Sequence, residues 1–327
     1  MKIIITGATG SFGGAMCRHF SQCGHDVVGV GKSKTPPARL LDFADYLSID
    51  ITRPYQLPAA DLCIHAAAIS DDKAKLKDLI GPNVVGVANT INAAKQCKTF
   101  IYISSSSVYL PQTEKITEEI AGQQNNKQLS AYGLSKLKGE EMIQEHFQGQ
   151  RCFIFRARAF YGPGDTQILP RLLKLHRNNK LNRVGEMKNL QSLTHFENMA
   201  HAIDCCLQSN KLGIHTYNVA DNQPYVSIDL LRKIMHSFYG ENLAEKEVKI
   251  GLLKFLGFFK IGGFTPLLVK AMTQNTVLDI SKIKNDLGYQ PQRSFFESFD
   301  EIEKWVNAIG GVEVLKNPDK QLCWTGF

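Results

Sequence analysis

The amino-acid sequence predicts an α/β protein with a doubly wound parallel sheet and a smaller C-terminal lobe. The chain opens with a strand, a glycine-rich turn and a helix over residues 2–24. Short apolar segments then alternate with helix-length segments as far as about residue 165, and this order builds a parallel sheet. Since the alternation thins beyond that point, we expect residues 1–165, joined by some later segments, to form the sheet. Residues 166–327 should form mainly the second lobe.

Composition limits the kinds of protein that this chain can be. Hydrophobic residues make up 43% of the 327 residues and charged residues 21%, which is typical of a globular protein with a sizeable core. The net charge of +7 is spread along the chain, so we expect small anionic ligands and no nucleic acid. The eight cysteines show no metal-ligand spacing. We therefore expect reduced thiols, no metal ion and a cytoplasmic location without a signal peptide.

The first strand, turn and helix have the pattern of a dinucleotide-binding unit. Ile3 to Ile5 form a short apolar strand, and Phe12, Met16 and Phe20 then recur at helical spacing. The turn between them presents backbone N–H groups and the positive end of a helix dipole, which together suit a pyrophosphate. A tight turn without a ligand would share this pattern. The candidate cofactor contacts in this unit are Gly7, Gly10, Ser11, Phe12 and Gly13.

The end of the second strand, residues 27–30, bears on the choice of cofactor. An acidic residue there would bind the adenosine ribose hydroxyls and favour NAD, but the chain continues with Gly31, Lys32 and Ser33. Ammonium and hydroxyl groups suit a 2′-phosphate, so the loop favours NADP over NAD by a small margin. A solvated basic loop would have the same composition.

Further strands of the sheet follow in order. Gly81-Pro82 is predicted to open a helix, because proline suits the first helical turn. His65 is interpreted as a packed residue at a strand end, not as a catalyst. The remaining strands are expected at residues 47–51, 62–65, 100–103 and 152–156.

A serine-rich strand end and a later helix carry the candidate chemistry. Four serines, residues 104–107, end the fifth strand, and a helix begins near Ser130. Tyr132 and Lys136 are four residues apart, so they share one face of that helix. A nearby ammonium lowers the pKa of a phenol, and a serine hydroxyl can hydrogen-bond a reacting oxygen. Together these groups can move a proton beside a hydride carrier. The Y-x-x-x-K pattern alone also occurs by chance in many helices.

The glycine spacing G-x-x-G-x-x-G, the serine-rich strand end and the Y-x-x-x-K helix resemble the extended short-chain dehydrogenase/reductase family, also called the NAD-dependent epimerase/dehydratase family. Residues 192–204, SLTHFENMAHAID, are similar to a segment of its 3β-hydroxysteroid dehydrogenase-like branch. Residues 276–291 resemble the closing segment of the family. The resemblance covers nearly the whole chain up to about residue 307. It implies a Rossmann sheet with a smaller C-terminal substrate-binding lobe.

The resemblance implies roles for residues at matching positions. Counting back from Tyr109, the catalytic hydroxyl falls on Ser105, with Ser104 and Ser106 as the neighbours that it could be confused with. The catalytic set is then Ser105, Tyr132 and Lys136. In the family, an Asp after the third strand meets the adenine, small residues follow the fourth strand, and an Asn steadies the active-site strand. The implied cofactor contacts beyond the glycine turn are Lys32, Asp50, Ile51, Ala66, Ala67, Asn83, Tyr132 and Lys136.

Departures from the family pattern narrow the range of reactions that we expect of this chain. Dehydratases of the family carry Asp and Glu where this chain has Ser106 and Ser107, which argues against 4,6-dehydratase chemistry. Nucleotide-sugar epimerases place an Asn where this chain has Ala159. We therefore expect an NAD(P)-dependent oxidoreductase that transfers a hydride between the nicotinamide and a secondary alcohol or ketone, with an apolar substrate favoured. Two alternatives stay open: a nucleotide-sugar epimerase with tightly bound NAD, and an NAD(P)-sensing or scaffold protein without chemistry.

Two expectations concern partners. Residues 251–272 are rich in Leu and Phe with lysines spaced through them. They are interpreted as core and lid helices of the second lobe, or alternatively as an amphipathic patch that contacts an anionic membrane surface. The resemblance also implies a homodimer through the helices flanking Tyr132.

Overall fold

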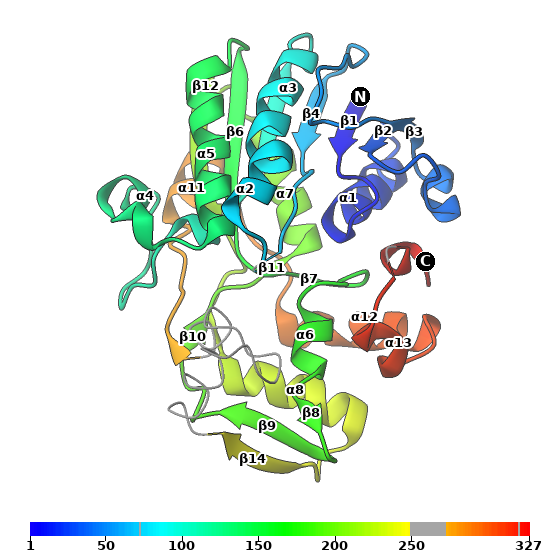
Figure 1. Cartoon of the computed structure of the whole chain (residues 1–327), viewed down its shortest axis with the longest axis vertical. Helices are drawn as coiled ribbons and strands as arrows, with labels where there is room; N and C mark the ends of the chain where they lie inside the picture. The colour runs from blue at the N-terminus through cyan, green and yellow to red at the C-terminus, as the bar shows by residue number, and fades with distance from the viewer. Residues whose placement is uncertain (72, 249–272, 320) are drawn as a thin grey trace.

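One large parallel sheet organises the protein, which a computed structural model describes over residues 1–71, 73–248, 273–319 and 321–327 (Figure 1). Its strand order is β12-β6-β5-β4-β1-β2-β3, and every neighbouring pair is parallel. The order reverses beside β1, whose neighbours are β2 and β4, so the sheet is doubly wound as predicted. The strands are β1 Lys2–Thr6, β2 Asp26–Gly31, β3 Asp45–Ser48, β4 Leu62–His65, β5 Thr99–Ser105, β6 Arg151–Ala157 and β12 Gly213–Val219.

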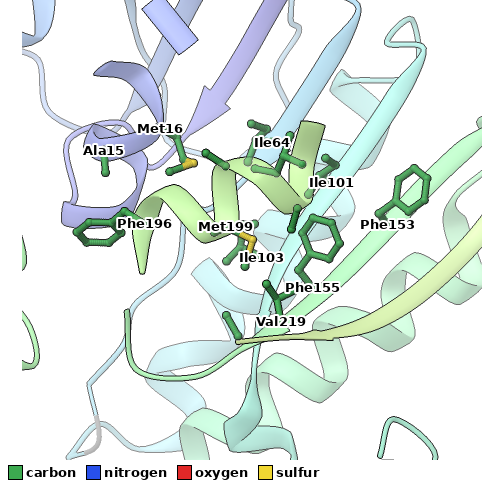
Figure 2. Close-up of a cluster of buried hydrophobic side chains, with 14 of the residues drawn as sticks. Ala15, Met16, Ile64, Ile101, Ile103, Phe153, Phe155, Phe196, Met199 and Val219 are labelled. Carbon is green, nitrogen blue, oxygen red and sulfur yellow. The ribbon is translucent and has the colours of Figure 1, made fainter. Parts of the chain in front are cut away.

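Helices cover both faces of this sheet. Side chains alternate along each strand, so Ile101 and Ile103 of β5 face one layer and Phe100 and Tyr102 face the other. The first layer is covered by α1 (Ser11–Gln22) and α7 (Phe196–Gln208), and Figure 2 shows their side chains against those of the strands. The second layer is covered by α3 (Gly86–Ala93) and α5 (Ala131–His146). Burial on both faces explains why the strands read as continuous apolar runs.

The helix predicted to open at Gly81-Pro82 begins earlier, so that prediction was wrong. The helical path starts with α2 (Leu76–Ile80), passes through a π-helical turn, η2 (Gly81–Val85), and continues into α3. Proline has no N–H and its ring clashes with the preceding turn of an α-helix. The wider turn at Pro82 accommodates the ring without ending the helix.

A smaller lobe lies beneath the carboxyl ends of the strands in Figure 1. Its three-stranded sheet has the order β14-β9-β8 and packs with α8 around an apolar cluster. The lobe also contains two short strand pairs, β7 with β11 and β10 with β13. Its elements are β7 Phe160–Tyr161, α6 Leu169–Leu173, β8 His176–Arg177, β9 Lys180–Val184, β10 Leu190–Gln191, β11 Thr194–His195, β13 Tyr225–Val226, α8 Ser227–Tyr239, β14 Ala244–Val248, α12 Phe295–Ala308 and α13 Val312–Lys316. The other short helical elements are η1 Ala38–Asp42, η3 Ser106–Val108, α4 Ile120–Gln123, η4 Asn126–Gln128, α11 Ser281–Leu287 and η5 Leu322–Trp324.

The last residues of the chain pack against the first helix. Trp324 is buried at 1% exposure, and a Cβ on Gly14 of α1 would lie 3.1 Å from its ring. Arg18 of α1 donates from Nη1 to the carbonyl oxygen of Cys323 at 2.9 Å, and its guanidinium lies 3.6 Å from the ring centre of Phe327. The sequence carried no pattern that predicted this contact.

Within the part of the chain that the structure describes, no helix combines the length and apolarity needed to cross a bilayer. The segment 251–272, for which a membrane contact was one interpretation, lies outside the described residues.

The close approach of α1 to the turn after β1 generates a stability prediction. A Cβ on Gly13 would overlap the carbonyl oxygen of Gly7, whereas a Cβ on Gly10 would lie 3.4 Å from the same oxygen, an ordinary contact. Gly13→Ala should therefore lower the free energy of unfolding by about 2 kcal/mol, since overpacking forces the backbone to move. The matched variant Gly10→Ala should cost less than about 1 kcal/mol. Urea unfolding without added dinucleotide measures both, and equal losses would contradict the assigned packing.

Candidate active site

The glycine turn lies at the carboxyl end of β1, where the strand order reverses. Gly7 has a φ of +75°, a conformation that favours glycine, and Gly10 caps α1 without a side-chain hydrogen bond. The side chain of Ser11 donates to the carbonyl oxygen of Gly164 at 2.5 Å, and the ring of Phe12 stacks on Phe160 at 4.4 Å. Since both side chains are held by the 160–164 segment, only the backbone N–H groups of Ser11 and Phe12 are placed for an anion at the helix N-terminus.

The loop after β4 contacts this turn. A Cβ on Gly7 would lie 2.9 Å from the Cα of Ala67, and Ala67 N–H donates to Thr6 Oγ1 at 3.2 Å. The structure therefore brings the predicted contacts Gly7, Ala66 and Ala67 together. Thr6 Oγ1 also lies 2.9 Å from Nδ1 of His65, which is fully buried beside the rings of Phe100 and Tyr102. Burial lowers the pKa of His65 to about 3, so His65 is a neutral packed residue, as interpreted from the sequence.

An ion pair at the ends of β2 and β3 was missed by sequence reasoning. Lys32 Nζ lies 3.0 Å from Asp50 Oδ2, and Asp50 Oδ1 accepts hydrogen bonds from the N–H and the hydroxyl of Thr52. The hydrogen bonds from Thr52, followed by the one from Lys32, lower the pKa of Asp50 to about 2. The predicted contacts Lys32 and Asp50 thus lie side by side. The carbonyl oxygen of Ile51 accepts a hydrogen bond from Asn89 Nδ2 at 2.9 Å, and the side chain of Ile51 faces Gly86 of α3.

Asn83 connects the loop after β4 to the helix that carries the candidate catalytic pair. Its Oδ1 accepts from the N–H of Ile69 at 2.8 Å, and its Nδ2 donates to Ser135 Oγ at 2.9 Å. Ser135 precedes Lys136 on α5. Asn83 is 1% exposed, so these bonds are sheltered from water and fix α5 against the loop.

Lys136 lies buried against the end of β5. Its Nζ donates to the carbonyl oxygen of Ile103 at 2.6 Å and lies 4.2 Å from the ring centre of Tyr102. Burial lowers the pKa of Lys136 to about 7, with Glu140 opposing that shift. Tyr132 lies one turn earlier on α5 and is half-buried. A lysine whose pKa is shifted strongly by its surroundings is typical of functional sites.

The three neighbouring serines differ in what they contact. Ser104 is buried and donates to Glu140 Oε1 at 2.5 Å, and Ser106 is buried at 4% exposure. Ser105, the last residue of β5, is half-buried and accepts from the N–H of Ser107 at 3.1 Å. The hydroxyl of Ser105 also donates to Ser107 Oγ at 3.1 Å. Of the three serines, Ser105 is the one that is not fully buried.

A buried network behind Ser104 was also missed by sequence reasoning. Glu140 of α5 pairs with Arg156 of β6 at 2.6 Å, and Arg156 donates from Nη1 to Tyr109 OH at 2.9 Å. Tyr109 in turn donates to Asn218 Oδ1 at 2.7 Å. The only sequence signal was the arginine near the end of the sixth strand.

Within the described ranges, no group of three or more His, Cys, Asp and Glu side chains is placed to hold a metal ion, and all eight cysteines are free thiols.

A parallel sheet with a glycine turn at its switch point, and a tyrosine and a lysine one turn apart beside a serine-ended strand, defines a dinucleotide-dependent enzyme of the short-chain dehydrogenase/reductase type. A sequence profile of the NAD dependent epimerase/dehydratase family matches residues 3–220, which is more than half of the chain. The protein therefore belongs to this family, as the resemblance predicted, and is an NAD(P)-dependent enzyme of the extended short-chain dehydrogenases/reductases.

Relatives within the family carry out different reactions. A 2-alkyl-3-oxoalkanoate reductase of Stenotrophomonas maltophilia (strain K279a) is 22% identical, over 93% of this chain and 98% of that protein. A 3beta-hydroxysteroid-dehydrogenase/decarboxylase, isoform 2 of Arabidopsis thaliana, is 26% identical over 75% of this chain and 49% of that protein. The solved UDP-glucuronic acid 4-epimerase from Bacillus cereus in complex with NAD has a TM-score of 0.71 and 22% identity, over 93% of this chain and 99% of that chain. This likeness shows the shared fold.

The environment of Lys136 generates a prediction about protons. At pH 7.5 a group with a pKa of about 7 is mostly neutral, and the phosphates of a bound dinucleotide should restore its charge. Binding of NADH should therefore take up more than about half a proton per site. Calorimetry in phosphate and Tris buffers, whose ionisation enthalpies differ, measures this uptake.

The control is Lys136→Met, which should still bind NADH weakly but without the proton. Unchanged uptake in that variant would place the titrating group elsewhere.

Proposed function

We propose that this protein is an NAD(P)-dependent oxidoreductase that transfers a hydride between the nicotinamide and a secondary alcohol or ketone. The observation that carries the proposal is the buried Lys136, held at the end of β5 one helical turn from Tyr132. The glycine turn fits a dinucleotide, because Gly7 has positive φ and neither Gly7 nor Gly13 has room for a side chain. The backbone N–H groups of Ser11 and Phe12, together with Asp50 and Ala66, would hold it.

The residues of this chain divide the work of proton transfer. When bound, the nicotinamide accepts a hydride from the alcohol carbon or returns it to the carbonyl carbon. Tyr132 takes the proton of the alcohol on its phenolic oxygen, or gives that proton back to the carbonyl oxygen. The Lys136 ammonium lowers the pKa of the phenol and binds the ribose, and Ser105 donates a hydrogen bond that orients the reacting oxygen.

Two observations support an apolar ketone or hydroxy compound as the substrate class. Ala159 has a φ of +44°, a left-handed conformation, at the place where the family's epimerases carry Asn, so the site has no amide there for a nucleotide sugar. The relative from Stenotrophomonas maltophilia, which spans nearly the same length, is named as a reductase of 2-alkyl-3-oxoalkanoates. We place the apolar part of the substrate in the smaller lobe, residues 166–327.

The competing candidate is a nucleotide-sugar epimerase, which the shared fold with an NAD-bound UDP-glucuronic acid 4-epimerase favours. Such an enzyme keeps its cofactor bound and returns the hydride. Purified protein that carries nicotinamide absorbance without added cofactor, and that interconverts UDP-sugars, would support this candidate over the reductase.

Removing the phenol tests the proposed chemistry. Tyr132→Phe should lower kcat on a panel of secondary alcohols and ketones by at least about 100-fold, because the variant cannot move the proton. The Kd for the dinucleotide should change less than about 2-fold, since the phenol acts on the proton. The control is Tyr55→Phe, which removes a hydroxyl bound to Thr90 at 2.7 Å, away from the glycine turn. Full turnover by Tyr132→Phe would refute the role of Tyr132.

A matched pair of lysines tests the preference for NADP that we propose. Lys32 lies 3.0 Å from Asp50 and Lys98 lies 2.7 Å from Asp61, with the lysine side chains 78% and 79% exposed. Lys32 follows β2 at the carboxyl edge of the sheet, whereas Lys98 precedes β5 at the opposite edge. Lys32→Ala should weaken NADPH about 10-fold and NADH less than about 2-fold, because it removes a charge-assisted hydrogen bond to the 2′-phosphate.

Lys98→Ala should leave both affinities unchanged, and fluorescence titration measures them. If Lys32→Ala weakens both dinucleotides equally, Lys32 does not bind the 2′-phosphate.

A further inference from the structure

Arg158 is the first residue after β6, at the carboxyl edge of the sheet. Ala157, the residue before it, is the register partner of Ser105 on β5. From the spacing of neighbouring strands and of consecutive residues, the Cα atoms of Arg158 and Ser105 are about 6 Å apart. Arg158 therefore borders the same edge as the proposed catalytic hydroxyl.

The backbone of Arg158 is fixed by the smaller lobe. Its N–H donates to Thr194 Oγ1 at 3.2 Å, and its carbonyl oxygen accepts from the same hydroxyl at 2.9 Å. The guanidinium Nη2 donates to Gln191 Oε1, and Gln191 Nε2 donates to the carbonyl oxygen of Gln274 at 2.7 Å. The second bond orients the Gln191 amide, so its oxygen faces the guanidinium.

The charge of Arg158 has no counterion among the described residues. Its Nε is buried and has no hydrogen-bond partner there. Burial lowers the pKa of Arg158 to about 10, and no charged neighbour contributes to that shift. The side chain nevertheless stays protonated at neutral pH.

Two buried arginines of the chain are satisfied differently. Arg156, two residues earlier, makes three hydrogen bonds to the carboxylate of Glu140. Arg18 donates to a backbone carbonyl and lies over the ring of Phe327. Arg158 as a whole is half-buried, but its Nε is shielded from water and has no partner among the described residues. A guanidinium left with one amide and such an Nε is suited to an anion that arrives from outside.

We propose that Arg158, oriented by Gln191, binds the carboxylate of an oxo acid or hydroxy acid substrate. This inference rests on the proposed function and names its substrate class. A planar carboxylate matches the fork of one guanidinium. The position beside Ser105 places the acid group close to the reacting carbon, and the apolar chain then extends toward the smaller lobe.

The test uses a matched pair of substrates, 3-hydroxyoctanoate and its methyl ester, which differ in the carboxylate charge and in one methyl group. The full-length enzyme with NADP should show a much lower KM for the acid than for the ester. Arg158→Gln should raise the KM for the acid about 100-fold and change the KM for the ester less than about 3-fold. Arg158→Lys should restore part of the preference for the acid. The control is Arg232→Gln, on the outer face of α8, which should change neither.

The outcomes separate a binding role from a structural one. If Arg158→Gln impairs acid and ester equally, or lowers the Tm together with both activities, Arg158 only supports the fold and the proposal is overturned. The proposal is also overturned if the wild-type enzyme turns over neutral alcohols but discriminates against acids. In that case the proposed function stands.

If no substrate is turned over, the proposed function fails, and calorimetric binding of 3-hydroxyoctanoate with NADP present tests the site directly. Binding of the acid, but not the ester, that is lost in Arg158→Gln supports the site. The inference is overturned if the acid does not bind. It is also overturned if Arg158→Gln weakens the binding of UDP-glucose instead.

Discussion

The buried ion pair between Glu140 and Arg156 is the interaction on which the candidate active site depends. Glu140 is on α5 and Arg156 on β6, and their side chains are 6% and 8% exposed. Removing one partner of such a pair leaves an uncompensated charge that costs about 3–5 kcal/mol. The pair therefore fixes α5 against the sheet at the level where Ser104 joins the network. Because Lys136 is one helical turn before Glu140, this contact also determines where the ammonium lies.

The positive charges near the carboxyl edge follow a consistent pattern. Lys136 and Arg158 both lie there, and burial lowers the pKa of each. Neither is neutralised by a direct ion pair within the described part of the chain. Charges that are already desolvated interact strongly with an incoming anion and need little reorganisation when it binds. The folded protein thus holds two desolvated basic groups at this edge, Arg158 as a cation and Lys136 as a group that a bound anion would charge. The outer charge of Lys32 is paired and exposed.

Local patterns in the sequence predicted most of the fold, and contacts between distant segments account for what they missed. The apolar runs at residues 3–5 and 62–65 became central strands, and the helix carrying Tyr132 and Lys136 begins where Ser130 caps it. The pairing of Lys32 with Asp50 could not be predicted, because it depends on which strands become neighbours. The same limit applies to Arg158, whose lack of a counterion is visible only once Gln191 and Thr194 are placed around it. The helix start was missed because proline more often begins a helix than occupies a widened turn.

The packing of the last residues on the first helix bears on the order in which the molecule is completed. Arg18 and Cys323 are 305 positions apart in the chain, so their contact closes one of the longest loops in the protein. Long-range contacts of this kind form late, after local helices and neighbouring strands. During synthesis on a ribosome, α1 and the glycine turn emerge well before Trp324, so Trp324 cannot cover them until the intervening segments have been made. This early segment is therefore among the last to reach its final packing.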